Sequence, residues 1–242
     1  MRIESIGDAS GINYDKTGPI IFTKGCNYRC GFCYNNSDGL LSPEKVESFL
    51  RGLETKTREG WYNGVTVCGG EPTIQSDLPY FLERLKKMGL AVKLDTNGKN
   101  FPMLGRLIKE GLVDYIAMDV KGPFRLYPAI TGMEHIDFRD GFLKGLGAVG
   151  GFPNHEFRTT VCPIVREDGK ITFMTPEEIG ETAEEIFNNL ANNNHRYFLQ
   201  GFLPVKNRLL DKRLEEFPET PKETLEKGVE IARQYLPNAQ KR

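Results

Sequence analysis

The chain has 242 residues, of which 39% are hydrophobic, and a formal net charge of −1. Because this charge provides no broad basic face, we expect neither nucleic acid nor an anionic membrane as a partner. The start Met1-Arg-Ile-Glu lacks an apolar signal segment, and no apolar run reaches membrane-spanning length. We therefore expect a cytoplasmic protein with a single domain over residues 1–242.

Apolar runs that predict strands alternate with helical patterns along the chain. The first half predicts strands at 19–23, 65–68, 91–94 and 113–118, and helices that begin at Ser42-Pro43, at about Leu78 and at Phe101. The second half predicts a Gly-broken helix at 138–149, strands at 156–162 and 196–202, and helices that begin at the capping boxes Thr175–Glu178 and Thr220–Glu223.

Six alternating strand–helix units predict an α/β fold with parallel strands and outer helices. Six units suit a partial (β/α)6 barrel better than a closed barrel of eight strands. An open doubly wound sheet is the alternative, and the periodicity does not choose between the two.

Three cysteines, Cys26, Cys30 and Cys33, follow the first predicted strand with the spacing Cys-x3-Cys-x2-Cys. A four-iron cluster takes four ligands, so three thiolates leave one iron open, and an open position is typical of catalytic metals. A structural zinc loop is the weaker alternative, because the chain has no second Cys-x2-Cys and its three histidines are scattered.

The two other cysteines, Cys68 and Cys162, lie in apolar runs, and we expect both to be small buried side chains. A cluster of three cysteines within a total of five does not suggest a disulfide framework. This cysteine use favours a reducing compartment.

Polar residues and glycines follow the later predicted strands where each strand ends. Each one alone is more typical of turns and helix caps. Together they favour a site, because the carboxyl ends of parallel strands meet at one rim. These strand-end residues are Gly69, Gly70, Glu71, Asp95, Asn97, Asp119 and Lys121.

The spaced cysteines, with Phe32 before the last of them and Gly69-Gly-Glu-Pro72 one unit later, resemble the radical S-adenosylmethionine (SAM) superfamily. Within it, the chain is most similar to the activating proteins of glycyl radical enzymes, above all those of anaerobic ribonucleoside-triphosphate reductase. The similarity covers roughly residues 10–235. Two positions depart from it: Tyr34 stands where the family often has His, and Leu203-Pro204 stands where pyruvate formate-lyase activase has His.

The resemblance implies that Cys26, Cys30 and Cys33 hold a [4Fe–4S] cluster whose open iron is chelated by SAM. Reductive cleavage of SAM then gives a 5′-deoxyadenosyl radical that abstracts hydrogen from a glycine of the partner enzyme. Asp119 and Lys121 are expected to meet the ribose and the carboxylate of SAM. The full set expected at the cofactor is Phe32, Gly69, Gly70, Glu71, Asp95, Asn97, Asp119, Lys121 and Arg158.

The partners implied by the resemblance are a glycyl radical enzyme, anaerobic ribonucleotide reductase in the first place, and a reduced flavodoxin or ferredoxin as electron donor. One alternative is a radical SAM enzyme that acts on a small molecule, such as a 7-carboxy-7-deazaguanine synthase. Another is a plain electron-transfer protein with Cys68 as fourth ligand, which leaves the Gly-Gly-Glu-Pro stretch unexplained.

Overall fold

The computed structural model describes residues 1–7, 15–34, 39–133 and 135–242, with the side chains of 135–138 left out. The chain forms two compact units. The first contains residues 1–27, 37–96 and 102–117, and the second contains residues 28–36, 97–101 and 118–242. The single domain over residues 1–242 stays a prediction. No described helix is long and apolar enough to cross a membrane.

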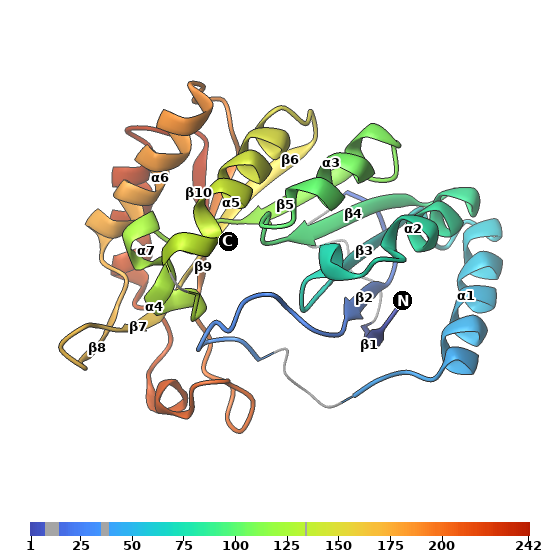
Figure 1. The fold of residues 1–242 in the computed structure, drawn as a ribbon, viewed down its shortest axis with the longest axis horizontal. Coiled ribbons are helices and arrows are strands. Elements are labelled where there is room, and N and C mark those ends of the chain that lie inside the picture. The colour runs from blue at the N-terminus through green and yellow to red at the C-terminus, as the bar shows by residue number, and fades with distance from the viewer. Residues whose placement is uncertain (8–14, 35–38, 134) are drawn as a thin grey trace. The chain divides into compact units, whose positions relative to one another are not determined.

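The first unit is built on parallel strands (Figure 1). Strand β2 pairs in parallel with β3, and β3 with β4, while β1 runs antiparallel to β2. Strand β5 follows β4 in the sheet order and ends in the second unit. The strands are β1 (Ile3–Gly7), β2 (Ile20–Thr23), β3 (Gly64–Gly69), β4 (Ala91–Thr96) and β5 (Tyr115–Asp119).

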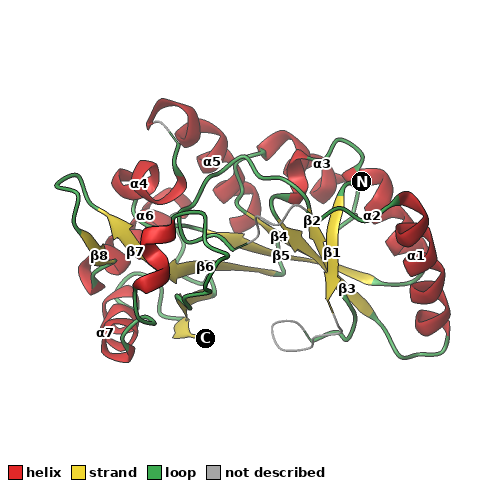
Figure 2. Ribbon diagram, turned by 90° about the horizontal axis from the view of Figure 1, so that it is seen from below, coloured by secondary structure: helices red, strands yellow, loops and turns green. Residues whose placement is uncertain are grey.

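The helices of the first unit form where the sequence predicts them. Ser42 caps α1 by accepting a hydrogen bond from the Lys45 amide, and Pro43 takes the first helical position. Helix α2 packs on β4 and buries an apolar face, and Figure 2 shows α2 and α3 on the same side of these strands. The helical elements are α1 (Pro43–Arg58), the short 3₁₀ turn η1 (Pro72–Ile74), α2 (Leu78–Lys87) and α3 (Phe101–Lys109).

The second unit continues the parallel arrangement. Strands β6 and β9 pair in parallel, as do β9 and β10, and β7 and β8 form a separate antiparallel pair. The strands are β6 (His155–Val161), β7 (Pro163–Val165), β8 (Ile171–Phe173), β9 (Tyr197–Gly201) and β10 (Ala239–Lys241). The helical elements are η2 (Phe124–Leu126), α4 (Tyr127–Thr131), α5 (His135–Gly150), α6 (Pro176–Leu190), η3 (Lys212–Glu216) and α7 (Lys222–Ala232).

The two predicted capping boxes differ in outcome. Thr175 and Glu178 form the box that starts α6, with both reciprocal hydrogen bonds present. The box at Thr220 is wrong: helix α7 starts after Pro221 without a side-chain cap. The Thr220 hydroxyl instead accepts from the Phe202 amide at 2.7 Å and donates to the Val161 carbonyl at 2.7 Å. Thr220 therefore ties the ends of β6 and β9 together.

The prediction of an α/β fold with mostly parallel strands and helices between them is confirmed. The six predicted strands are β2, β3, β4, β5, β6 and β9, each shifted by a few residues at most. Strand β1, the β7–β8 pair and β10 are additions that the sequence patterns did not predict. The strand β2 leads directly into the cysteine loop, as expected.

Candidate functional site

The cysteine loop begins in the first unit with Cys26 and continues in the second with Cys30 and Cys33. All three carry thiols outside any disulfide, and they are exposed, buried and half-buried in that order. No three His, Cys, Asp or Glu side chains among the described residues are grouped around a position for a single metal ion. A four-iron cluster does not require such a group, because its cysteines bind different irons. The soft donor set on one short loop therefore fits the cluster.

In the first unit, the Gly-Gly pair after β3 packs directly on the start of the cysteine loop. The Gly70 amide donates to the Thr23 carbonyl at 2.9 Å, and the Glu71 amide donates to the Gly25 carbonyl at 2.8 Å. A Cβ on Gly70 would lie 1.8 Å from the Gly25 oxygen. Gly69 has φ +104, and its Cβ would lie 2.3 Å from the Thr23 nitrogen. Both glycines are thus required by the loop itself, and their expected place at the cofactor stays a prediction.

The Glu71 carboxylate holds the same region from inside. Its side chain is buried, and one oxygen accepts from the Thr73 amide at 3.1 Å and from the Thr73 hydroxyl at 2.6 Å. The Thr96 hydroxyl donates to that oxygen at 2.7 Å. Because Thr96 ends β4, Glu71 joins the ends of β3 and β4. No sequence pattern singled out the two threonines, although Thr73 lies two residues after Glu71 and Thr96 lies between Asp95 and Asn97.

Asp95 and Asn97, at the end of β4, each have a local partner. The Asp95 carboxylate pairs with the buried Lys93 ammonium, which also lies 6.0 Å from the centre of the Tyr115 ring. The Asn97 side chain accepts from the Lys99 amide at 3.0 Å, which is ordinary turn chemistry after a strand. The role of both residues at the cofactor stays a prediction.

In the second unit, Asp119, Lys121 and Arg158 form one ionic cluster. Lys121 Nζ lies 2.8 Å from one Asp119 oxygen, and Arg158 donates to the other at 3.0 Å from Nε. Burial opposes ionisation of Asp119, but the charges of Arg158 and Lys121 outweigh it and lower its pKa to about 2. The cluster has two cations for one carboxylate. The structure brings these three predicted residues together, and Lys121 and Arg158 are too buried for an exposed surface pair.

Lys121 also faces the cysteine loop. Its ammonium lies 5.7 Å from the centre of the Phe32 ring. Burial disfavours the charged form, yet Asp119 and Cys30 raise the pKa of Lys121 above its ordinary value. The Lys121 amide donates to the hydroxyl of the fully buried Tyr127 at 3.1 Å. Tyr127 thereby positions the backbone of Lys121, a role that no local sequence pattern indicates.

A segment after β9 holds the second half of the cysteine loop. The Leu210 amide donates to the Cys33 carbonyl at 3.1 Å, and the Asp211 amide donates to the Gly31 carbonyl at 2.9 Å. Leu203, at the position without the family histidine, is 59% exposed, and Tyr34 is 50% exposed. No local sequence pattern indicates Leu210 and Asp211, because the contact joins segments far apart in the chain.

The remaining cysteines differ in burial. Cys162 is buried as predicted, and burial, together with the charge of Cys30, raises its pKa to about 12. Cys68, on β3, is half-buried, so the expected full burial is wrong for it.

Comparison with known proteins gives one family. The sequence profile of the Radical SAM superfamily matches residues 20–150. A protein of Methanocaldococcus jannaschii that is provisionally named a glycyl-radical enzyme activating enzyme is 28% identical over 98% of this chain and 93% of its own length. The 7-carboxy-7-deazaguanine synthase of Thermoplasma acidophilum is 34% identical, but over 43% of this chain and 48% of its own length.

Solved structures support the fold. The crystal structure of Streptococcus suis SuiB bound to S-adenosylmethionine has a TM-score of 0.62 and 17% identity, and covers 90% of this chain. This chain spans 48% of SuiB, and at this identity the likeness concerns the fold alone.

Proposed function

The chain belongs to the radical SAM superfamily, with a [4Fe–4S] cluster and SAM as its cofactors, and on that premise we propose that it activates a glycyl radical enzyme. The observation that carries the proposal is the likeness to the M. jannaschii activating enzyme over nearly the whole of both chains. Matches to enzymes with small-molecule substrates, the 7-carboxy-7-deazaguanine synthase and the probable GTP 3′,8-cyclases, extend over 40–52% of this chain. The expected partner is anaerobic ribonucleoside-triphosphate reductase.

Cys26, Cys30 and Cys33 would hold the cluster, which would supply the electron for reductive cleavage of SAM into methionine and a 5′-deoxyadenosyl group that takes a hydrogen atom from the α-carbon of a glycine. The partner is left with a glycyl radical, and 5′-deoxyadenosine is the second product. The residues of this chain hold, orient and shield these groups. Membership of the superfamily leaves the zinc loop and the plain electron-transfer protein without support.

The first unit contributes the geometry of the cysteine loop. Gly69 and Gly70 allow its backbone to lie against the end of β3, and Glu71 fixes that end through its bonds to Thr73 and Thr96. We assign these residues to holding Cys26 at the cluster and to presenting backbone groups to the ammonium of SAM.

The second unit contributes charge beside its own part of the cysteine loop, residues 28–34. With two cations for one carboxylate, the cluster of Asp119, Lys121 and Arg158 has a net positive charge that suits the carboxylate of SAM. Lys121 is assigned to that carboxylate because its ammonium lies next to Phe32 of the cysteine loop. Asp119 is assigned to the ribose hydroxyls, which would donate hydrogen bonds to its carboxylate oxygens.

The test uses the iron-loaded protein, SAM, a reductant and the anaerobic reductase from the same organism, without oxygen. The expected results are a doublet electron paramagnetic resonance signal on the reductase and one 5′-deoxyadenosine per radical. With the reductase glycine deuterated at its α-carbon, deuterium should appear in 5′-deoxyadenosine. Transfer of hydrogen from a small heterocycle instead, with no radical on the reductase, would establish the small-molecule alternative.

A further inference from the structure

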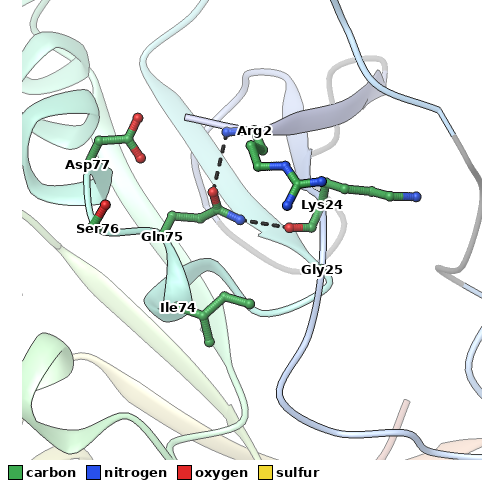
Figure 3. Close-up of a pocket in the computed structure, with 7 residues that line it drawn as sticks. All are labelled: Arg2, Lys24, Gly25, Ile74, Gln75, Ser76 and Asp77. Carbon is green, nitrogen blue, oxygen red and sulfur yellow. Dashed lines mark hydrogen bonds between the residues drawn. The ribbon is translucent and has the colours of Figure 1, made fainter.

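A shallow cavity of about 410 Å³ lies in the first unit beside the start of the cysteine loop (Figure 3). Its lining includes Gly25, the residue directly before Cys26, and Gln75, which follows the turn η1. Ile74, on the rim, is 39% exposed. The cavity therefore opens on the surface within one residue of a cluster ligand.

Two basic residues line the cavity, and their backbones are fixed side by side. The Lys24 amide donates to the Arg2 carbonyl at 2.9 Å, which extends the β1–β2 pairing. The buried Gln75 side chain joins both strands: it accepts from the Arg2 amide at 3.3 Å and donates to the Lys24 carbonyl at 2.7 Å. Figure 3 shows the side chains of Arg2 and Lys24 extending in the same direction from Gln75.

The cavity has an excess of positive charge. Among the described residues that line it, the one carboxylate is that of Asp77, which lies across Gln75 from the two cations and pairs with the amino group of Met1. Within the part of the chain that the structure describes, no carboxylate forms an ion pair with Arg2. A positive, solvent-open cavity on a chain with net charge −1 attracts an anionic group of a partner and steers its approach.

We propose that this cavity is the docking site of an acidic one-electron carrier protein, with a surface carboxylate of the carrier between Arg2 and Lys24. The proposal rests on the proposed function, since that chemistry requires one electron from outside for each SAM cleaved. The carrier loses one electron, and the cluster gains it. Docking beside Gly25 brings the carrier close to the cluster through Cys26, while exposed Ile74 adds an apolar contact.

The experiment compares Arg2→Glu/Lys24→Glu with a control of equal charge change, Lys45→Glu/Arg51→Glu, on the exposed face of α1. Both are tested as iron-loaded protein with an acidic ferredoxin, and cluster reduction and ferredoxin affinity are measured separately. In the cavity variant, at low ionic strength, we expect the rate of reduction by ferredoxin to fall about tenfold and the Kd to rise about tenfold. The wild-type rate should fall with salt, and the variant's rate should be nearly insensitive to it.

Reduction by dithionite separates this proposal from the proposed function. SAM cleavage driven by dithionite should be unchanged in the cavity variant, because a small reductant needs no docking site. Arg2→Gln/Lys24→Gln, with half the charge change, should show a smaller loss in the same direction. Unchanged ferredoxin affinity in the Glu variant would overturn the proposal. Normal ferredoxin reduction with a lost glycyl radical would instead assign the cavity to the glycyl radical enzyme.

Discussion

The carbonyl oxygen of Gly25 lies 1.8 Å from the point that a Cβ on Gly70 would occupy. The main chain of the cysteine loop therefore fills the space beside the Gly-Gly pair. Substitutions at Gly70 act first on this loop, and the approach of SAM is affected through it.

Gly70→Ala should displace the cysteine loop, because the added carbon overlaps main-chain atoms of Gly25, which cannot move aside by a change of rotamer. We expect a destabilisation of about 1–3 kcal/mol and incomplete cluster loading. Thermal unfolding of the iron-free protein and the iron content after reconstitution measure the two effects. Gly52→Ala is the control, since an added Cβ there meets nothing within 4 Å. This substitution should stabilise α1 by about 0.5–1 kcal/mol. Equal behaviour of the two variants would contradict the packing argument.

Replacing Cys26, Cys30 or Cys33 by Ala should each abolish the stable cluster, because every one of them supplies a ligand. Cys162→Ala serves as the comparison. The wild-type Cys162 thiol is buried and its pKa is raised, so it keeps its proton and does not bind iron. The variant should therefore retain the full iron content. Iron and sulfide analysis after anaerobic reconstitution checks both statements. A loss of iron in Cys162→Ala would assign a ligand role to that residue.

Lys121→Ala should weaken SAM binding by about ten- to hundred-fold, the range expected for a lost charge-assisted hydrogen bond. Asp119→Ala should weaken it similarly, and should also lower thermal stability, because it leaves Lys121 and Arg158 without their shared carboxylate. Calorimetric titration of iron-loaded protein with SAM gives the affinities. Lys170→Ala, at an exposed site of the second unit, is the control. Unchanged SAM affinity in both variants, at full iron content, would show that the ionic cluster stabilises the fold and does not bind SAM.

Glu185 should make stability depend on pH. Burial raises its pKa to about 7, and the charge of Glu181 adds to the effect, although the hydrogen bond from the Phe124 amide opposes it. The folded protein then holds this proton more tightly than the unfolded chain, so the free energy of unfolding falls as pH rises from about 4.5 to about 7.

Glu185→Gln keeps the side chain neutral at every pH, and its carbonyl oxygen still accepts from Phe124. Its melting temperature should therefore exceed that of the wild type at pH 8 and match it at pH 5. Circular dichroism melts at the two values measure the difference. Glu230→Gln, on the exposed side of α7, should shift the melting temperature equally at both. An equal shift of the melting temperature at pH 5 and pH 8 in Glu185→Gln would show that Glu185 ionises normally.

By itself, the sequence determined the elements whose signals are local. The six predicted strands and the caps at Ser42 and Thr175 follow from apolar runs and from side chains next to a helix start. The cysteine spacing and the Gly-Gly-Glu-Pro stretch likewise determined the superfamily, because each motif lies on one short segment.

Tertiary structure decided which groups those residues contact. Thr220 has the local pattern of a cap, but the buried carbonyl of Val161 requires a donor, and the Thr220 hydroxyl supplies it in place of capping α7. The missing side chain of Gly70 leaves space for the backbone of Gly25, and the Tyr127 hydroxyl positions the backbone of Lys121. Strand β10 forms because β9 offers an open edge, although its three residues carry no strand pattern. Such contacts join segments far apart in the chain, and a hydrogen-bond partner at that distance leaves no periodic signal in the sequence.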